Sequence, residues 1–205
     1  MKERFLNKDA SIAIIGLGYV GLPLLIEFGL KGFKVMRFDT DPQKARSLLS
    51  GRSYLQHIPQ ASICKLLEEK RLRAFDNFER IEEADAVIIC VPTPLTKHRD
   101  PDLSYIVNST EAIAGGLKHG ALVVLESTTY PGTTEEVVKP ILERSGQKCG
   151  KDFFLAYSPE REDPNNPQFK TKDIPKIVSG VTEKCLDLAT ALYSQIVMTV
   201  PVSSP

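Results

Sequence analysis

Residues 11–21 read SIAIIGLGYVG, an apolar run that ends in the string G-x-G-x-x-G at residues 16–21. The apolar run predicts a buried strand, and the apolar spacing of Tyr19–Leu30 predicts a helix directly after it. In such a unit the first glycine allows a tight turn, the second lets the backbone approach a pyrophosphate, and the third lets the helix pack on the strand. The helix N-terminus offers free N–H groups and its positive dipole end to phosphates. The stretch therefore predicts a dinucleotide-binding loop, with a ligand-free tight turn as the alternative.

The second predicted strand, Phe33–Phe38, ends at Asp39, which lies 39 − 18 = 21 residues past the middle glycine. A carboxylate at this place accepts hydrogen bonds from the adenosine ribose hydroxyls. It also repels the 2′-phosphate of NADP, and neither Thr40 nor Asp41 is basic. Arg37 is expected on the same side of the strand as Asp39, and it is the one feature that favours NADP, because a guanidinium can bind the 2′-phosphate. The pattern therefore favours NAD as the cofactor.

Beyond this unit the chain alternates between short apolar runs and amphipathic stretches. The apolar runs predict strands at Ser11–Gly16, Phe33–Phe38, Ala86–Val91, Ala121–Leu125, Phe153–Tyr157, Lys176–Ser179 and Ile196–Val200. The amphipathic stretches predict helices at Tyr19–Leu30, from Asp41 onward, and at Ser62–Lys70, Leu103–Leu117, Thr133–Glu143 and Glu183–Tyr193. Short, wholly apolar strands that alternate with helices indicate a mostly parallel sheet covered on both faces. We therefore expect a Rossmann-like, doubly wound α/β fold in one domain over residues 1–205.

The composition excludes several classes of function. The 26 Lys and Arg residues equal the 26 Asp and Glu residues, so the chain lacks the positive charge by which proteins bind nucleic acid or anionic membranes. The longest apolar run, Ala86–Val91, is far shorter than the ~18 residues of a membrane span. No secretory leader is recognisable, so we expect a cytoplasmic protein with reduced cysteines. The histidines and cysteines have no metal-ligand spacing, which predicts no metal site.

Two motifs follow predicted strands, where the loops of an α/β sheet line its ligand crevice. In CVPTPL (residues 90–95) two prolines fix the backbone and leave the Thr93 hydroxyl to meet a cofactor ribose or phosphate; a stiff surface turn is the alternative. In ESTTYPGTT (residues 126–134) we expect Ser127 and Thr128 where a polar substrate or a water is bound. Thr133 and Glu136 have the spacing of a capping box, which predicts a structural role for that threonine.

A third motif, YSPEREDP at residues 157–164, places three carboxylates and a guanidinium in the loop after another predicted strand. A carboxylate there can act as general base through a water, with Arg161 binding a phosphate or keeping an acid ionised. A solvated charged loop is the alternative reading.

Taken together, these motifs resemble those of the UDP-glucose/GDP-mannose dehydrogenase family. They occur in that family's order: the glycine loop, FDTDPQK (38–44), GRSYLQHIP (51–59), VPTPL (91–95), DPDLSY (100–105), ESTTYPGTTEE (126–136) and SPEREDP (158–164). The resemblance covers residues 11–205. SPEREDP is similar to the branch that oxidises UDP-N-acetylglucosamine, although Asn165 stands where that branch has glycine.

The resemblance implies a four-electron oxidation of the C6 hydroxyl of a UDP-sugar to the uronic acid, for surface polysaccharide synthesis. In that scheme NAD takes a hydride from the alcohol, a cysteine captures the aldehyde as a thiohemiacetal, a second NAD oxidises this to a thioester, and water hydrolyses it. The resemblance implies that Thr128 positions the catalytic water, that Glu160 is the general base, and that Glu160 and Arg161 contact the substrate. The residues implied to line the NAD are Gly16, Gly18, Tyr19, Val20, Gly21, Asp39, Thr93 and Thr128.

The family's nucleophilic cysteine stands in a Gly-rich, His-preceded motif, and Cys64, Cys90, Cys149 and Cys185 do not. The family's central helix would begin right after Pro205. We therefore expect an N-terminal fragment without the UDP-sugar-binding domain, one that binds NAD but does not turn over, from a protein that is a homodimer at full length. The alternatives are a non-catalytic NAD-binding module, a UDP-N-acetylmannosamine or UDP-glucose dehydrogenase and, least favoured, a β-hydroxyacid dehydrogenase.

Overall fold

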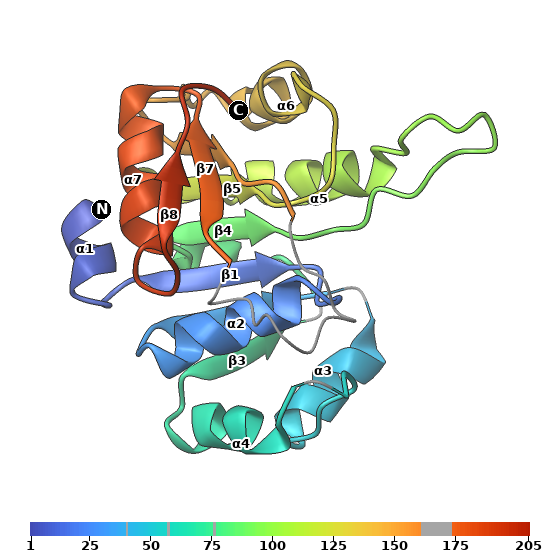
Figure 1. The fold of residues 1–205 in the computed structure, drawn as a ribbon, viewed down its shortest axis with the longest axis vertical. Coiled ribbons are helices and arrows are strands. Elements are labelled where there is room, and N and C mark those ends of the chain that lie inside the picture. The colour runs from blue at the N-terminus through green and yellow to red at the C-terminus, as the bar shows by residue number, and fades with distance from the viewer. Residues whose placement is uncertain (40, 57, 76, 161–173) are drawn as a thin grey trace.

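The computed structural model describes residues 1–39, 41–56, 58–75, 77–160 and 174–205 (Figure 1). Its centre is an eight-stranded sheet in the order β3-β2-β1-β4-β5-β6-β7-β8. The strands are β1 (Ser11–Ile15), β2 (Lys34–Phe38), β3 (Leu72–Phe75), β4 (Ala86–Ile89), β5 (Leu122–Leu125), β6 (Phe154–Tyr157), β7 (Lys176–Gly180) and β8 (Thr199–Pro201). All neighbouring strands are parallel except the antiparallel pair β6 and β7. The predicted mostly parallel sheet is therefore confirmed.

Helices cover both faces of this sheet (Figure 1). They are α1 (Lys2–Leu6), α2 (Gly21–Leu30), α3 (Pro42–Leu49), α4 (Gln60–Glu68), α5 (Ser104–Ala114), α6 (Lys139–Glu143) and α7 (Glu183–Tyr193), with a 3₁₀ turn η1 (Ile81–Glu83) and a π-helical segment η2 (Thr133–Val138). No helix in the described part of the chain combines the length and apolar character needed to span a bilayer.

The central strand β1 shows why the strands are apolar throughout. Ile12 and Ile14 belong to the hydrophobic core that includes α2, α4 and α7. The alternate residues Ala13 and Ile15 belong to the core that includes α5 and α6. Because side chains alternate between the two faces of a strand, a strand covered on both sides has no solvent-facing position. This double cover is what the wholly apolar runs predict.

The order of the strands determines where a ligand can bind. From β1 the chain proceeds outward through β2 and β3, and it then returns to place β4 on the other side of β1. The carboxyl ends of β1 and β4 are therefore followed by loops that diverge, which opens a crevice between them. The glycine loop follows β1, and the loop with Thr93 follows β4.

Strand β3, helix α1 and the 3₁₀ turn η1 were missing from the sequence prediction. Strand β3 is a sheet edge on which only Leu72 is buried, so it lacks the apolar pattern of the inner strands. Helix α1 is five residues long with Phe5 as its buried residue. Phe5 packs into the core, and ion pairs join the helix to the rest of the fold, from Arg4 to the buried Asp85 (2.5 Å) and from Lys2 to Asp187 (2.6 Å). Pairing between residues so distant in the chain leaves no local sequence pattern.

Candidate functional site

The glycine loop connects β1 to α2, as predicted. Gly16 has a φ of +82°, and a Cβ at this residue would lie 2.7 Å from the carbonyl oxygen of Cys90. A Cβ at Gly21 would lie 2.0 Å from the carbonyl oxygen of Gly16, whereas a Cβ at Gly18 would meet nothing within 4 Å. The chain's own packing therefore requires the first and third glycines. The second one leaves open space above the loop, which is where a pyrophosphate would pass.

The N-terminus of α2 lies next to this open space. The helix begins at Gly21, two residues after the predicted start at Tyr19, and its N-cap Val20 gives no side-chain hydrogen bond to the first turn. Gly18, Tyr19 and Val20 line the cavity at this end. In the first turn the N–H of Leu22 donates to the carbonyl oxygen of Gly18 at 3.3 Å and Pro23 has no N–H, so the positive end of the helix dipole is the feature that favours a phosphate here.

Asp39 follows β2 and faces the glycine loop. One carboxylate oxygen accepts from the backbone N–H of Leu17 and the other from that of Asp41, both at 2.9 Å. Burial alone would raise the pKa of Asp39, but these N–H groups and the Lys44 ammonium outweigh burial and lower the pKa. The group is therefore an anion at neutral pH, and its remaining lone pairs can accept from ribose hydroxyls.

Two basic residues near Asp39 differ in their placement. Lys44, in the first turn of α3, lies 3.1 Å from the Asp39 carboxylate and lines the cavity. Sequence reasoning missed it, although its place in FDTDPQK was a usable signal. Arg37 is fully buried and donates to the carbonyl oxygen of Asp41 at 3.0 Å. Arg37 is not one of the described residues that line the cavity, so its guanidinium is not placed to bind the 2′-phosphate of NADP there.

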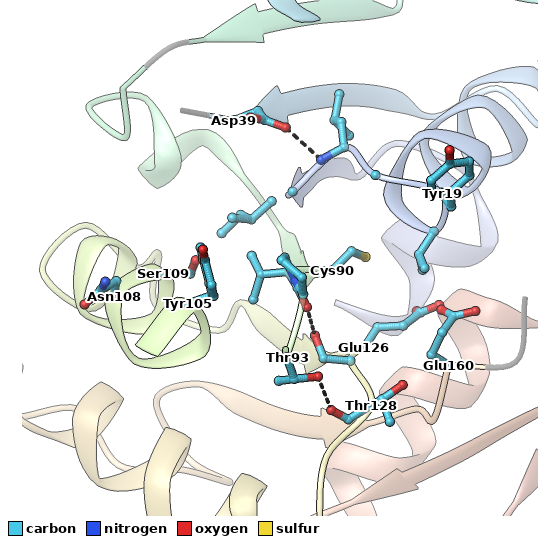
Figure 2. Close-up of a pocket in the computed structure, with 18 of the residues that line it drawn as sticks. Tyr19, Asp39, Cys90, Thr93, Tyr105, Asn108, Ser109, Glu126, Thr128 and Glu160 are labelled. Carbon is cyan, nitrogen blue, oxygen red and sulfur yellow. Dashed lines mark hydrogen bonds between the residues drawn. The ribbon is translucent and has the colours of Figure 1, made fainter. Parts of the chain in front are cut away.

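These groups border one cavity of about 1010 Å³ at the carboxyl edge of the sheet. Figure 2 shows Asp39 at one end and Thr128 and Glu160 at the other, with Cys90 between them and Thr93 beside Thr128. All the described residues predicted to contact cofactor line it, except Gly21, which lies beneath the loop. Tyr105, Asn108, Ser109 and Ala112 of α5 add a wall that the sequence analysis did not identify. Their i, i+3, i+4, i+7 spacing on one helix face was the available signal.

The loops after β4 and β5 are joined at the cavity. The Thr93 hydroxyl donates to the carbonyl oxygen of Thr128. The Thr128 side chain remains exposed in the cavity lining, as its predicted role requires. Ser127 is different, because it is buried and its hydroxyl donates to the carbonyl oxygen of Val91 at 2.8 Å. Its hydroxyl therefore joins the two loops, and because Ser127 also lines the cavity, its expected role beside a bound molecule stays a prediction.

The predicted capping box at Thr133 and Glu136 is wrong. The N-cap of η2 is Gly132, with a φ of 94°, and no side chain caps the helix. Thr133 is buried, and its hydroxyl donates to the carbonyl oxygen of Tyr130 at 2.9 Å. The turn at Pro131-Gly132 shifts the helix start by one residue, so the threonine stabilises the turn instead of the helix end. Thr133 therefore still has a structural role, but its hydroxyl bonds to the carbonyl oxygen of Tyr130 and not to the first turn of the helix.

Glu160 follows β6 and lines the cavity. Arg161, Glu162 and Asp163, which belong to the same predicted motif, lie outside the described residues, as does His57. Cys90 lines the cavity between Asp39 and Glu160 (Figure 2). Burial, and after it the negative charge of Glu126, raises the pKa of the Cys90 thiol well above its usual range. A thiol that keeps its proton is a poor nucleophile, which agrees with the packing role predicted for this cysteine.

A buried charge cluster that sequence reasoning missed lies beneath this end of the cavity. Glu126, at the end of β5, lines the cavity and lies 2.5 Å from the ammonium of Lys176 on β7. The hydroxyl of Tyr193 on α7 donates to the other carboxylate oxygen of Glu126. The three residues are 50 and 17 positions apart in the chain, since 176 − 126 = 50 and 193 − 176 = 17. Only the tertiary fold brings them together.

The described residues contain no group of three or more His, Cys, Asp or Glu side chains that could hold a metal ion. The polar groups of the described residues that line the cavity are hydroxyls, carboxylates, the Asn108 amide and the Lys44 ammonium, together with the backbone. These are groups that recognise sugar hydroxyls and phosphates.

Comparison with known proteins gives the same picture. Residues 10–197 match the NAD binding domain of the UDP-glucose/GDP-mannose dehydrogenase family. The chain is 38% identical over 191 residues to UDP-N-acetyl-D-glucosamine 6-dehydrogenase of Pseudomonas aeruginosa, covering 93% of this chain and 44% of that protein. It is 40% identical over 190 residues to the enzyme of the same name from Salmonella typhi, covering 92% and 44%.

A solved structure of UDP-D-ManNAc dehydrogenase from Pyrococcus horikoshii superimposes with a TM-score of 0.86 at 34% identity. That match covers 95% of this chain and 47% of the archaeal chain. The chain therefore spans about half the length of the relatives it matches.

Proposed function

Because this chain belongs to the UDP-glucose/GDP-mannose dehydrogenase family and carries its NAD-binding domain, we propose that it serves the NAD-dependent oxidation of the C6 hydroxyl of a UDP-sugar to the uronic acid. One observation carries this proposal. Asp39, the glycine loop, Thr128 and Glu160 come from four separate loops and line one cavity. A ribose anchor, a phosphate cradle and a hydroxyl–carboxylate pair thus lie in the order in which a dinucleotide and its reaction partner need them.

The residues present fit NAD. Asp39 would hold the adenosine ribose, and Lys44 neutralises part of its charge. The space above Gly18, which no protein atom occupies within 4 Å of a Cβ position, admits the pyrophosphate. Thr93 lies farther along the cavity, toward the nicotinamide end. When bound, NAD supplies the hydride acceptor.

Thr128 and Glu160 are the proposed catalytic groups of this chain. The exposed Thr128 hydroxyl would hold a water at the reacting carbon, and the Glu160 carboxylate would take a proton from it as general base. Glu160, with Arg161, would also contact the substrate. The backbone of Thr128 is held by the Thr93 hydroxyl, so the loop that positions the water is tied to the loop that borders the cofactor.

We propose UDP-N-acetylglucosamine as the substrate, because of the SPEREDP motif and the two relatives of that activity at 38% and 40% identity. UDP-N-acetylmannosamine is the second candidate, favoured by the archaeal relative. We propose that the protein is cytoplasmic, because both NAD and UDP-sugars are present in the cytoplasm. We also propose that the full-length protein has a second domain that binds the UDP-sugar, and that it is a homodimer.

The chain by itself is proposed to bind NAD without turnover. Cys90 is the cysteine among the described residues that line the cavity, and burial raises the pKa of its thiol well above the usual range. A buried, protonated thiol does not capture an aldehyde. Binding of NAD without turnover is also what a non-catalytic NAD-binding module would show, and such a module is the alternative function.

The experiment is to express the complete gene product, add NAD, and count the NADH formed per UDP-N-acetylglucosamine. A four-electron oxidation yields about two NADH per sugar. A response to UDP-N-acetylmannosamine or UDP-glucose alone would overturn the choice of sugar. NAD binding without NADH from any of the three would favour the binding module.

A further inference from the structure

The buried cluster of Glu126, Lys176 and Tyr193 has no part in the function proposed above. Glu126 is 1% exposed, Tyr193 is 0% exposed and Lys176 is 9% exposed. Burial alone would lower the pKa of Lys176, but the Glu126 carboxylate outweighs burial and raises the pKa. The pair therefore consists of an anion and a cation, and Lys176 also lies over the ring of Tyr193 at 5.6 Å from its centroid. Burying two charges in this way is expensive, and apolar residues would serve stability equally well.

The pair is oriented with respect to the cavity. Glu126 is among the residues that line the cavity, whereas Lys176 lies behind it and is not among the described lining residues. Figure 2 shows the Glu126 side chain directed toward the same end of the cavity as that of Glu160. Lys176 is also within electrostatic reach of Glu160 and of the neutral Cys90 thiol. The side chain of Glu126 is itself buried, so the negative end of the ion pair lies just beneath the cavity wall and the positive end lies behind it.

This end of the cavity lies opposite Asp39. A dinucleotide whose adenosine ribose is held by the carboxylate after the second strand, with its pyrophosphate over the glycine loop, extends its nicotinamide across to the loops of the following strands. Those loops carry Thr93, Glu126 and Thr128. The nicotinamide ring has a positive charge in NAD⁺ and none in NADH. Charges near this end thus affect the two forms of the cofactor differently, and charges near Asp39 do not.

We propose that Glu126, backed by Lys176, makes the site prefer the oxidised cofactor, NAD⁺, to NADH. The inference rests on the NAD site of the proposed function and deepens it. The Glu126 carboxylate is buried just beneath the cavity wall and Lys176 lies behind it, so the pair attracts the cationic ring more strongly than it repels it. Such a preference helps an oxidising enzyme release NADH and take up NAD⁺. Glu126 is on this view a specificity-determining residue rather than a catalytic one.

The test measures the dissociation constants of NAD⁺, NADH and ADP-ribose for the unmodified chain and three variants. Glu126→Gln removes the negative end and leaves Lys176 behind it, so NAD⁺ is expected to weaken about tenfold relative to NADH. E126Q/K176M removes both charges, which also protects against misfolding from an unpaired buried cation. Its preference for NAD⁺ is expected between those of the unmodified chain and Glu126→Gln.

Glu135→Gln is the matched control, because it makes the same charge change at an exposed residue that does not line the cavity. Its ratio of NAD⁺ to NADH affinity should equal that of the unmodified chain. ADP-ribose lacks the nicotinamide, so its affinity should be the same in all four proteins.

Several results would overturn the inference. An unchanged NAD⁺-to-NADH ratio in both Glu126→Gln and E126Q/K176M is one of them. Weakening of NAD⁺, NADH and ADP-ribose by the same factor would likewise overturn it, since that outcome means general damage to the site. Failure of the unmodified chain to bind any of the three ligands would instead refute the proposed NAD site itself.

Discussion

The backbone N–H of Leu17 donates to the carboxylate of Asp39 at 2.9 Å, so the group expected to bind the ribose also fastens the glycine loop. The loop is further held by the hydroxyl of Tyr54, which donates to the carbonyl oxygen of Leu17 at 3.0 Å. Leu17 is thus held through both its backbone N–H and its backbone C=O. The conformation that cradles a pyrophosphate is therefore organised before the cofactor arrives, which reduces the entropic cost of binding.

Substitution Asp39→Asn should affect both stability and binding. The neutral amide accepts more weakly from Leu17 and loses its ion pair with Lys44, so the free energy of unfolding should fall by about 1–2 kcal/mol. The amide no longer repels a 2′-phosphate, so the affinity ratio of NAD to NADP should shrink. Urea denaturation and titration with both cofactors check the two effects. A variant with the original stability and the original ratio would show that Asp39 has neither role.

The glycine loop offers a matched pair of alanine variants. Gly21→Ala places a Cβ 2.0 Å from a backbone oxygen, so it should lower the free energy of unfolding by about 2 kcal/mol or more. Gly18→Ala meets no protein atom within 4 Å and should leave stability within about 0.5 kcal/mol. Its methyl group occupies the space meant for the pyrophosphate, so NAD affinity should fall about tenfold or more. Unimpaired NAD binding by a folded Gly18→Ala variant would contradict this assignment of the open space.

Two cysteines should make stability depend on pH. The Cys149 thiol, then the Thr182 hydroxyl and the Leu155 N–H, donate to the sulfur of Cys185 and lower the pKa of Cys185 to about 6, while that of Cys149 is raised. A lowered pKa stabilises the fold above the ordinary thiol range, and this contribution is lost as the pH falls toward 6. The free energy of unfolding should therefore decrease from about pH 9 to about pH 6.

Guanidinium denaturation across this range tests the assignment. Cys185→Ala should remove that part of the pH dependence, and Cys64→Ala, which changes a cysteine in α4 far from the pair, should keep it. An equal slope in the Cys185→Ala variant and the unmodified chain would contradict the assignment.

Glu160→Gln tests the proposed general base. The amide cannot accept a proton, so NADH formation by the complete gene product should fall about 100-fold or more. NAD affinity should change little, because the cofactor is held mainly from the side of Asp39 and the glycine loop. Stopped-flow absorbance of NADH and equilibrium titration separate the two quantities. Loss of NAD affinity with unchanged turnover of bound cofactor would assign Glu160 to cofactor binding instead.

The parts of the site that sequence predicts well are local. Gly16, Gly18 and Gly21 act through the backbone of one turn, and Asp39 ends the next strand at a set distance, so their roles follow from spacing. Glu126 and Lys176 could not be found in this way, because one is a strand-end acid and the other begins an apolar strand 50 residues later. Ser127 shows the same limit: its position in the motif indicates the cavity edge, which it lines, but not that its hydroxyl donates to the carbonyl oxygen of Val91.

The most direct test of the account is a calorimetric titration of the 205-residue chain with NAD and, in parallel, with NADP. The account predicts one saturable NAD site per chain and affinity for NADP at least about tenfold weaker, because the ionised Asp39 repels the 2′-phosphate. Absence of saturable NAD binding by the folded chain, or tighter binding of NADP than of NAD, would contradict it.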